Sequence, residues 1–202
     1  MSLAGWKQLT PVYFYTTLVV CLIAVTRGEG FSWRRDFLLI GLGVLSWTLI
    51  EYGLHRFVFH YSARSALGRK FVYAAHLSHH ENPRALNRLF SSLILSVPIA
   101  TGYLLLAWVA TRSLHSATYL FAGLAAGYFG YEWLHFQAHH RRPRLRFFRY
   151  LRKYHLLHHY QTPELRFGVT SPLFDVTLGT FRPVRKPFLR AKAQRRKALP
   201  RS

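Results

Sequence analysis

Four long stretches without a charged side chain constrain the fold of this chain most strongly. The formal net charge is +21, yet no Asp, Glu, Lys or Arg occurs in residues 9–26, 37–50, 89–111 or 113–131. About 20 apolar residues in an α-helix cross a bilayer, and the second stretch reaches that length if it continues to Leu54. Core helices of soluble all-helical proteins rarely lack charge for so long. The sequence therefore predicts an all-α integral membrane protein with four transmembrane helices, at residues 9–26, 37–54, 89–111 and 113–134.

The 202 residues suffice for one domain with a sizeable core and are too few for two enzyme domains. We expect a single membrane domain over 1–202, in which a helical cap is formed by residues 55–88 and 135–181 and is followed by a basic tail at 182–202. Only Lys7 precedes the first apolar stretch, without a small-residue cleavage pattern. This predicts a retained membrane anchor instead of a removed signal peptide.

The distribution of Lys and Arg predicts the orientation. Six occur from Arg56 to Arg88 and seventeen follow Glu132, whereas Arg112 is alone between the third and fourth stretches. Because cytoplasmic loops are enriched in Lys and Arg, the N-terminus and the cap are expected in the cytosol. The charges between the first and second apolar stretches are weak evidence for the opposite orientation. Arg-rich stretches at 61–73 and 141–154 are expected on the membrane surface.

Ten of the twelve histidines fall into four groups. Two are triplets with the spacing His-x2-His-His, and a looser pair precedes each triplet by about twenty residues. The pairs are His55 with His60 and His135 with His139, and the triplets are His76, His79, His80 and His155, His158, His159. Corresponding first histidines are 80 residues apart in the pairs and 79 in the triplets. Two similar halves therefore predict one site built between them.

Ionisable side chains next to hydrocarbon are costly and tend to be functional, and neutral imidazole is a common metal ligand. Ten imidazoles exceed the ligand shell of one first-row metal, so two metals fit the count. An all-nitrogen shell suits iron, zinc, copper or nickel without choosing between them. His115 is expected to be a packing or hydrogen-bonding residue, and His140 stays unassigned.

Two local features leave alternatives open. His55 and His60 are five residues apart, about 140° on a regular helix, so they need a bend or bulge to share a metal, or else they bind different metals. Glu51 and Glu132 each precede a histidine pair by about one helical turn. They are candidates either to orient imidazoles as hydrogen-bond acceptors or to pair with nearby arginines.

A high positive charge is also typical of nucleic-acid binders. Here the basic residues flank apolar stretches, and no nucleic-acid-binding motif occurs in the sequence. Membrane placement explains the charge more simply. A membrane metal-binding or transport protein is a further alternative, which predicts histidines along a path through the helices.

The pattern His-x4-His, His-x2-His-His, His-x3-His, His-x2-His-His over about residues 47–181 resembles the fatty acid hydroxylase superfamily of integral membrane di-metal enzymes. Glu51-Tyr52 before His55-Arg56, and the stretch from Phe167 to Asp175 with Gly179-Thr180, look most like its fatty acid 2-hydroxylase branch. The resemblance implies a non-haem di-iron centre and names no catalytic residue beyond its ligands. These ligands would be His55, His60, His76, His79, His80, His135, His139, His155, His158 and His159.

The resemblance also implies a reaction. Such enzymes use O2 and two external electrons to hydroxylate a lipid chain, and zinc can replace iron in purified samples. The expected substrate is a fatty acid or lipid-linked acyl chain from the bilayer, hydroxylated at the 2-position. The expected electron donor is a separate cytochrome b5-like protein, ferredoxin or reductase. The site would face the cytoplasm, at a bacterial inner membrane or the endoplasmic reticulum. The alternative in the same superfamily is a sterol or carotenoid desaturase or hydroxylase.

Overall fold

The structure, a computed structural model, describes residues 9–184, and within this range it contains helices and turns and no β-strand. This confirms the all-α prediction. Residues 185–202, most of the expected basic tail, lie outside the described part. The elements are α2 (Thr10–Thr26), η1 (Arg27–Glu29), α3 (Trp33–Gly53), η2 (Leu54–Phe59), α4 (Ala66–Val72), η3 (Tyr73–Leu77), α5 (Ser78–Glu81), α6 (Leu86–Leu89), α7 (Leu93–Thr111), α8 (Leu114–His140), α9 (Arg146–Tyr160) and α10 (Leu173–Thr177).

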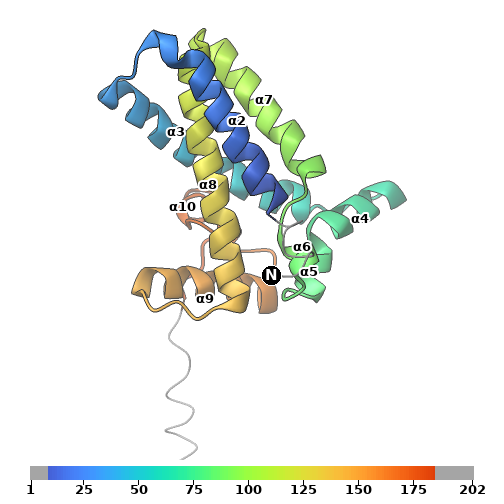
Figure 1. Cartoon of the computed structure of the whole chain (residues 1–202). Coiled ribbons are helices and arrows are strands. Elements are labelled where there is room, and N and C mark those ends of the chain that lie inside the picture. Colours follow the sequence, from blue (N-terminus) through green and yellow to red (C-terminus); the bar gives the residue numbers. More distant parts are fainter. Residues whose placement is uncertain (1–8, 185–202) are drawn as a thin grey trace, which may run out of the picture.

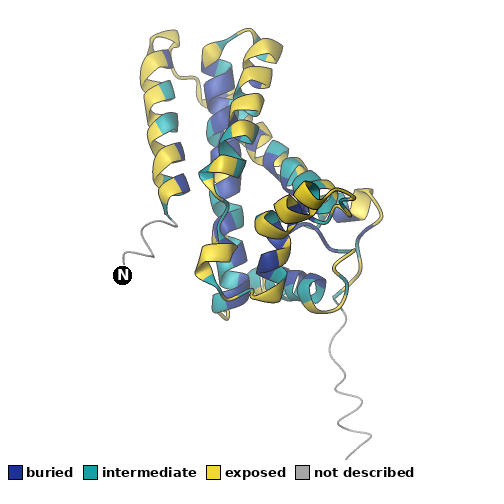
Figure 2. Ribbon diagram, turned by 90° about the vertical axis from the view of Figure 1, so that its right-hand side faces the viewer, coloured by how far each residue is buried: buried dark blue, intermediate teal, exposed yellow. Residues whose placement is uncertain are grey.

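Helices α2, α3, α7 and α8 form a bundle, and the elements outside it, apart from η1 between α2 and α3, gather at one end (Figure 1). Helix α8 contacts the other three long helices and also α9. Buried residues are concentrated in the middle of the bundle, whereas α2 is exposed along most of its length (Figure 2). Helix α9 lies across the end where the elements of the cap meet (Figure 1).

Three helices are long and apolar enough to cross a membrane: Thr10–Glu29, Trp33–Phe59 and Leu86–Thr111. They correspond to the first three predicted spans. Their outward surfaces carry exposed apolar side chains such as Leu38, Ile94 and Leu106, as contact with lipid requires. Helix α8, which contains the fourth predicted span, is not among the three, and a fourth crossing stays a prediction. Fourteen of its 27 residues are buried, so most of α8 faces protein and need not be apolar.

Small residues let α3 and α8 approach each other closely. A methyl carbon added at Gly123 would overlap the carbonyl oxygen of Ile40, and one added at Gly43 would overlap that of Leu120. A methyl carbon added at Gly127 would likewise overlap the Trp47 side chain. Small residues at such crossings are typical of helices packed in membranes. This contact joins the two halves of the chain and thereby sets the distance between their histidines.

The opposite end of the bundle is held by a buried polar cluster. His115 lies 2.9 Å from a carboxylate oxygen of Asp36, which also accepts a hydrogen bond from Arg35 at 2.7 Å. His115 is 2% exposed. The structure therefore places His115 in the hydrogen-bonding role that the sequence predicts, far along α8 from the other histidines.

We predict that Gly123→Ala lowers the free energy of unfolding by about 1–3 kcal/mol, because the added methyl forces α3 and α8 apart. Gly130→Ala is the matched control on α8, since no atom lies within 4 Å of its added methyl. It should be neutral, or stabilising by up to about 1 kcal/mol through helix propensity. Thermal unfolding in detergent measures both, and equal melting temperatures would contradict the packing argument.

Candidate metal centre

All ten grouped histidines come together at the cap end of the bundle, in two sets of five. Within each set, the candidate ligand nitrogens lie within 4.8 Å of one another. We call the sets group A and group B. Group A contains His55, His60, His76, His80 and His158, and group B contains His79, His135, His139, His155 and His159.

The two groups are related by the repeated histidine spacing of the two halves, which we call the internal repeat. Each takes both histidines of one pair and the first and last histidines of the following triplet. The middle histidine of each triplet crosses over, so that His158 joins group A and His79 joins group B. A shift of 79 or 80 residues along the chain therefore converts group A into group B, with the crossing pair exchanged. The histidines of the two similar halves therefore come together in one place, and their use as one site stays a prediction.

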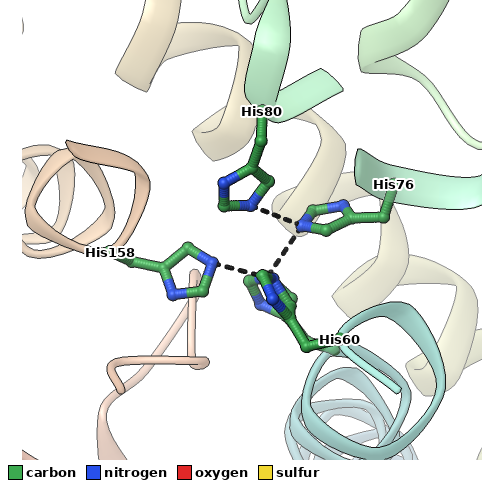
Figure 3. Close-up of side chains that lie close together, drawn as sticks. His60, His76, His80 and His158 are labelled. Carbon is green, nitrogen blue, oxygen red and sulfur yellow. Dashed lines mark hydrogen bonds between the residues drawn. The ribbon is translucent and has the colours of Figure 1, made fainter. Parts of the chain in front are cut away.

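In group A the Nε2 atoms point at one another from different elements (Figure 3). The Nε2 atom of His76 lies 3.0 Å from that of His55 and 2.9 Å from that of His80. The Nε2 atom of His158 lies 3.1 Å from that of His60. His158 comes from α9, whereas the other four belong to the first half of the chain.

A π-helix allows His55 and His60, five residues apart, to lie on the same side of the chain. Element η2 spans Leu54–Phe59, and the His60 backbone N–H donates to the His55 carbonyl at 3.2 Å. Hydrogen bonds between residues five apart are the mark of a π-helix, and they bring these two side chains to one side. Of the two alternatives left open by the spacing, the structure therefore shows the bulge, and both histidines belong to one group. In the second half, His135 and His139 are four apart on regular α8 and need no such change.

Group B has the same convergent arrangement and is more deeply enclosed. The His139 Nε2 atom lies 3.2 Å from that of His79 and 2.9 Å from that of His155. The rings of His80 and His159, one from each group, stack with centroids 4.0 Å apart. The two groups therefore adjoin, as a two-metal site requires.

The donor chemistry of both groups fits metal ions. The Nδ1–H groups of His55 and His158 donate to the carbonyl oxygens of Phe167 and Leu165, at 2.5 and 2.8 Å. Each ring is thereby a tautomer whose Nε2 lone pair faces another imidazole. In group B, the Nδ1 atoms of all five rings are buried without a hydrogen-bond partner in the described chain. Converging lone pairs are stabilised by a cation between them.

The segment Leu165–Thr170 is held in place by two buried carboxylates. Glu51 accepts hydrogen bonds from the backbone N–H groups of Val169 and Thr170 and from the Thr170 hydroxyl. Asp175 accepts from the N–H groups of Phe167 and Gly168, both at 2.8 Å. Within the described residues, Glu51 therefore neither accepts a hydrogen bond from an imidazole nor pairs with an arginine, the two roles considered from the sequence. Its partners lie in the segment whose Phe167 and Leu165 carbonyls accept hydrogen bonds from His55 and His158.

Glu132 corresponds to Glu51 in the second half, and it too binds backbone. It accepts from the Ser91 N–H at 3.0 Å, in the segment that leads into α7. Each glutamate therefore holds the segment that follows the other half's triplet. Neither role of Glu132 considered from the sequence, imidazole acceptor or arginine partner, is what the structure shows.

An apolar cavity inside the bundle reaches group A. Its lining is supplied by α2, α3, α7 and α8 and includes Leu95, Ile99, Ala100, Phe121 and Leu124. At the cap end the same cavity touches His55 and Phe59. A second, more polar pocket is lined by His60, Tyr61, Arg69 and Tyr73 among others.

Comparisons with known proteins agree with this geometry. The family described as "Fatty acid hydroxylase" matches residues 40–180. The chain belongs to the fatty acid hydroxylase family. A dihydroceramide fatty acyl 2-hydroxylase of Arabidopsis thaliana is 35% identical over 185 residues, which cover 87% of this chain and 76% of that protein. The ceramide very long chain fatty acid hydroxylase of Saccharomyces cerevisiae is 40% identical over 148 residues, 71% of this chain and 38% of that protein.

A solved structure also resembles this fatty acid hydroxylase. It is described as full-length scs7p with only the hydroxylase domain visible, and it matches with a TM-score of 0.79 at 34% identity. The match covers 90% of this chain and 69% of that chain. The family resemblance read from the histidine pattern is thus confirmed, including its fatty acid 2-hydroxylase branch.

Sequence reasoning missed the residues that support His55 and His158. Asp175 and the carbonyls of Leu165 and Phe167 were not singled out, although the stretch from Phe167 to Asp175 carried part of the family resemblance. A signal was present, because Asp175 is an isolated acid in a stretch without other charges after Arg166. Backbone carbonyls as partners carry no side-chain signature, so sequence alone does not reveal them.

Burial keeps the cap histidines neutral. It lowers the pKa of His60 and His80 to about 4 and that of His79 to about 3. Burial also holds the pKa of His76, His155 and His158 well below the usual value, with neighbouring imidazoles acting in the same direction. The charged form is disfavoured because it loses hydration. Neutral imidazole is the form that binds metals.

We predict that the metal-free protein loses stability as the pH falls. An unfolded histidine takes up its proton near pH 6.5, whereas folded His60 and His80 do so near pH 4. Between these values the unfolded state binds more protons, so the free energy of unfolding decreases with decreasing pH. Melting temperatures of chelator-treated protein between pH 7.5 and 4.5 measure this. The double variant His60→Gln, His80→Gln should depend less steeply on pH, and a pH-independent melting temperature of the parent would contradict the prediction.

Proposed function

We propose that this chain is an O2-dependent di-iron hydroxylase that adds a hydroxyl group at the 2-position of a fatty acid or lipid-linked acyl chain. The observation that carries the proposal is the placement of two adjoining five-histidine groups at one end of a membrane-type helix bundle, where group A reaches an apolar cavity at His55. The relatives named above support it, since their names describe 2-hydroxylation of fatty acyl chains and hydroxylation of ceramide fatty acids.

In this proposal the ten histidines of groups A and B hold two iron ions, one per group, and zinc can replace iron in purified protein. Bound iron would supply the activation of O2 that an unactivated C–H bond requires. The protein supplies neutral imidazoles, fixed tautomers at His55 and His158, and a site that adjoins an apolar cavity.

The two pockets support the choice of substrate and position. The apolar cavity suits a hydrocarbon chain, and it reaches group A at His55. The polar pocket reaches the same group at His60, and Arg69, Tyr61 and Tyr73 in its lining suit a carboxyl or amide head group. A lipid that spans both pockets has the first carbons of its acyl chain next to group A. Hydroxylation near the head group follows from this placement.

The proposal also includes the surroundings of the site. The cap faces the cytoplasm, in a bacterial inner membrane or the endoplasmic reticulum, because most Lys and Arg residues flank that end. Electrons then come from a separate cytosolic-side donor of the cytochrome b5-like, ferredoxin or reductase class. A transport function receives no support, since the ten histidines gather in two adjoining groups and do not line a path along the bundle.

We predict that His158→Ala abolishes hydroxylation and lowers the metal content, because His158 is the ligand that the second half contributes to group A. Membrane insertion should persist, since it depends on the apolar helices. Elemental analysis of detergent-purified protein measures metal per chain, and lipid profiling of cells with and without the gene measures 2-hydroxy acyl lipids. Two metals per chain in the variant would reject the ligand assignment.

An unchanged 2-hydroxy acyl pool without the gene would favour a sterol or carotenoid substrate.

We predict that Ala100→Phe reduces turnover of long acyl chains by about tenfold or more and leaves metal content unchanged, because the new ring fills the cavity where the chain would lie. Short chains should be affected less. Ala107→Phe is the matched control: Ala107 is buried on the same helix but does not line the cavity. Assays with acyl chains of different length separate the two variants. Equal loss for all lengths in both variants would argue against this path.

A further inference from the structure

The two histidine groups differ in how their rings are supported. In group A, His55 and His158 each donate Nδ1–H to a backbone carbonyl, those of Phe167 and Leu165. In group B, none of the five Nδ1 atoms has a hydrogen-bond partner in the described chain, although all five are buried. The groups are alike in ligand type and number, so they differ in this support and in the deeper burial of group B.

The support depends on how firmly the segment Leu165–Thr170 is held. Both of its carboxylate anchors are buried: Glu51 is 4% exposed and Asp175 is fully buried. Asp175 binds the two N–H groups next to the Phe167 carbonyl and also the Thr180 hydroxyl at 2.7 Å. Buried hydrogen bonds to carboxylates are strong and geometrically demanding. The two carbonyls therefore keep fixed positions relative to α3.

Arg166, between these two carbonyls, is held in the left-handed region with a φ of 63°. This conformation is unfavourable for a side chain larger than glycine and persists only where the surroundings enforce it. Here the Arg166 N–H donates to the Thr180 carbonyl at 3.2 Å, and its guanidinium group donates to the Thr162 hydroxyl. The turn aims the carbonyls of Leu165 and Phe167 at two different imidazoles of one group.

We infer that Glu51 and Asp175 are positioning residues, which act through the segment Leu165–Thr170 to give group A a higher metal affinity than group B. The inference rests on the proposed function, because it presumes a metal in each group. Partners that orient a metal-binding histidine typically change metal affinity by about 10- to 100-fold. Group A is therefore the slowly exchanging site and group B the labile one.

Zinc release from two half-sites tests this. His135→Ala with His139→Ala leaves group A, and His60→Ala with His80→Ala leaves group B. Each purified protein is loaded with Zn2+, and release to a chromophoric chelator is followed over time. We expect release from group A to be about 10- to 100-fold slower. Equal rates, or faster release from group A, would overturn the inference alone. A parent protein that binds no zinc or iron would overturn the proposed function as well.

Glu51 variants in the two half-sites separate positioning from general damage. Glu51→Ala should speed zinc release from group A by about tenfold or more and leave release from group B unchanged. Glu51→Gln should restore slow release, because its carbonyl oxygen still accepts from Val169 and Thr170. Glu132→Ala, the corresponding change in the other half, should not alter group A. Asp175→Asn should act like Glu51→Ala. Equal acceleration in both half-sites would show a structural role and reject the inference.

Discussion

Ten imidazoles that face one another, seven of them buried and three partly buried, are stable only if their protons and lone pairs are arranged to match. Five helical elements and the turn after η2 deliver these rings, and burial keeps those of the cap neutral. A neutral ring has one N–H and one lone pair, so rings that meet at Nε2 need partners for their Nδ1–H groups or a cation between them. The other contacts of the cap provide such hydrogen-bond partners or leave the Nε2 lone pairs facing a common centre.

The internal repeat explains how so many rings reach one place. Each half alone supplies four histidines to its own group and one to the other. The crossing of His79 and His158 makes each group incomplete without the other half. The close approach of α3 and α8 at Gly43 and Gly123 fixes the distance between the halves. Packing inside the bundle therefore controls the geometry of a site that lies beyond its end.

A local backbone change compensates for the different spacing of the histidine pairs in the two halves. The extra residue between His55 and His60 is absorbed by the π-helix η2, whereas α8 stays regular between His135 and His139. The carboxylates Glu51 and Glu132 both bind backbone N–H groups of the other half's segment. Of the two glutamates, only Glu51 binds a segment whose carbonyls accept hydrogen bonds from imidazoles. The halves are thus similar in ligands and different in their supporting contacts.

The sequence by itself determined the helical class, three helices fit to cross a membrane, and the ten histidines that gather at one end. These follow from composition and short-range spacing, which act within one helix. The tertiary structure decided which histidines share a group, whether a bulge unites His55 and His60, and what Glu51 binds. The partners of Glu51 and the grouping of His60 with His158 depend on contacts between distant residues, 119 positions apart for Glu51 with Thr170 and 98 for His60 with His158. No local periodicity encodes them, because they arise only when the two halves pack together.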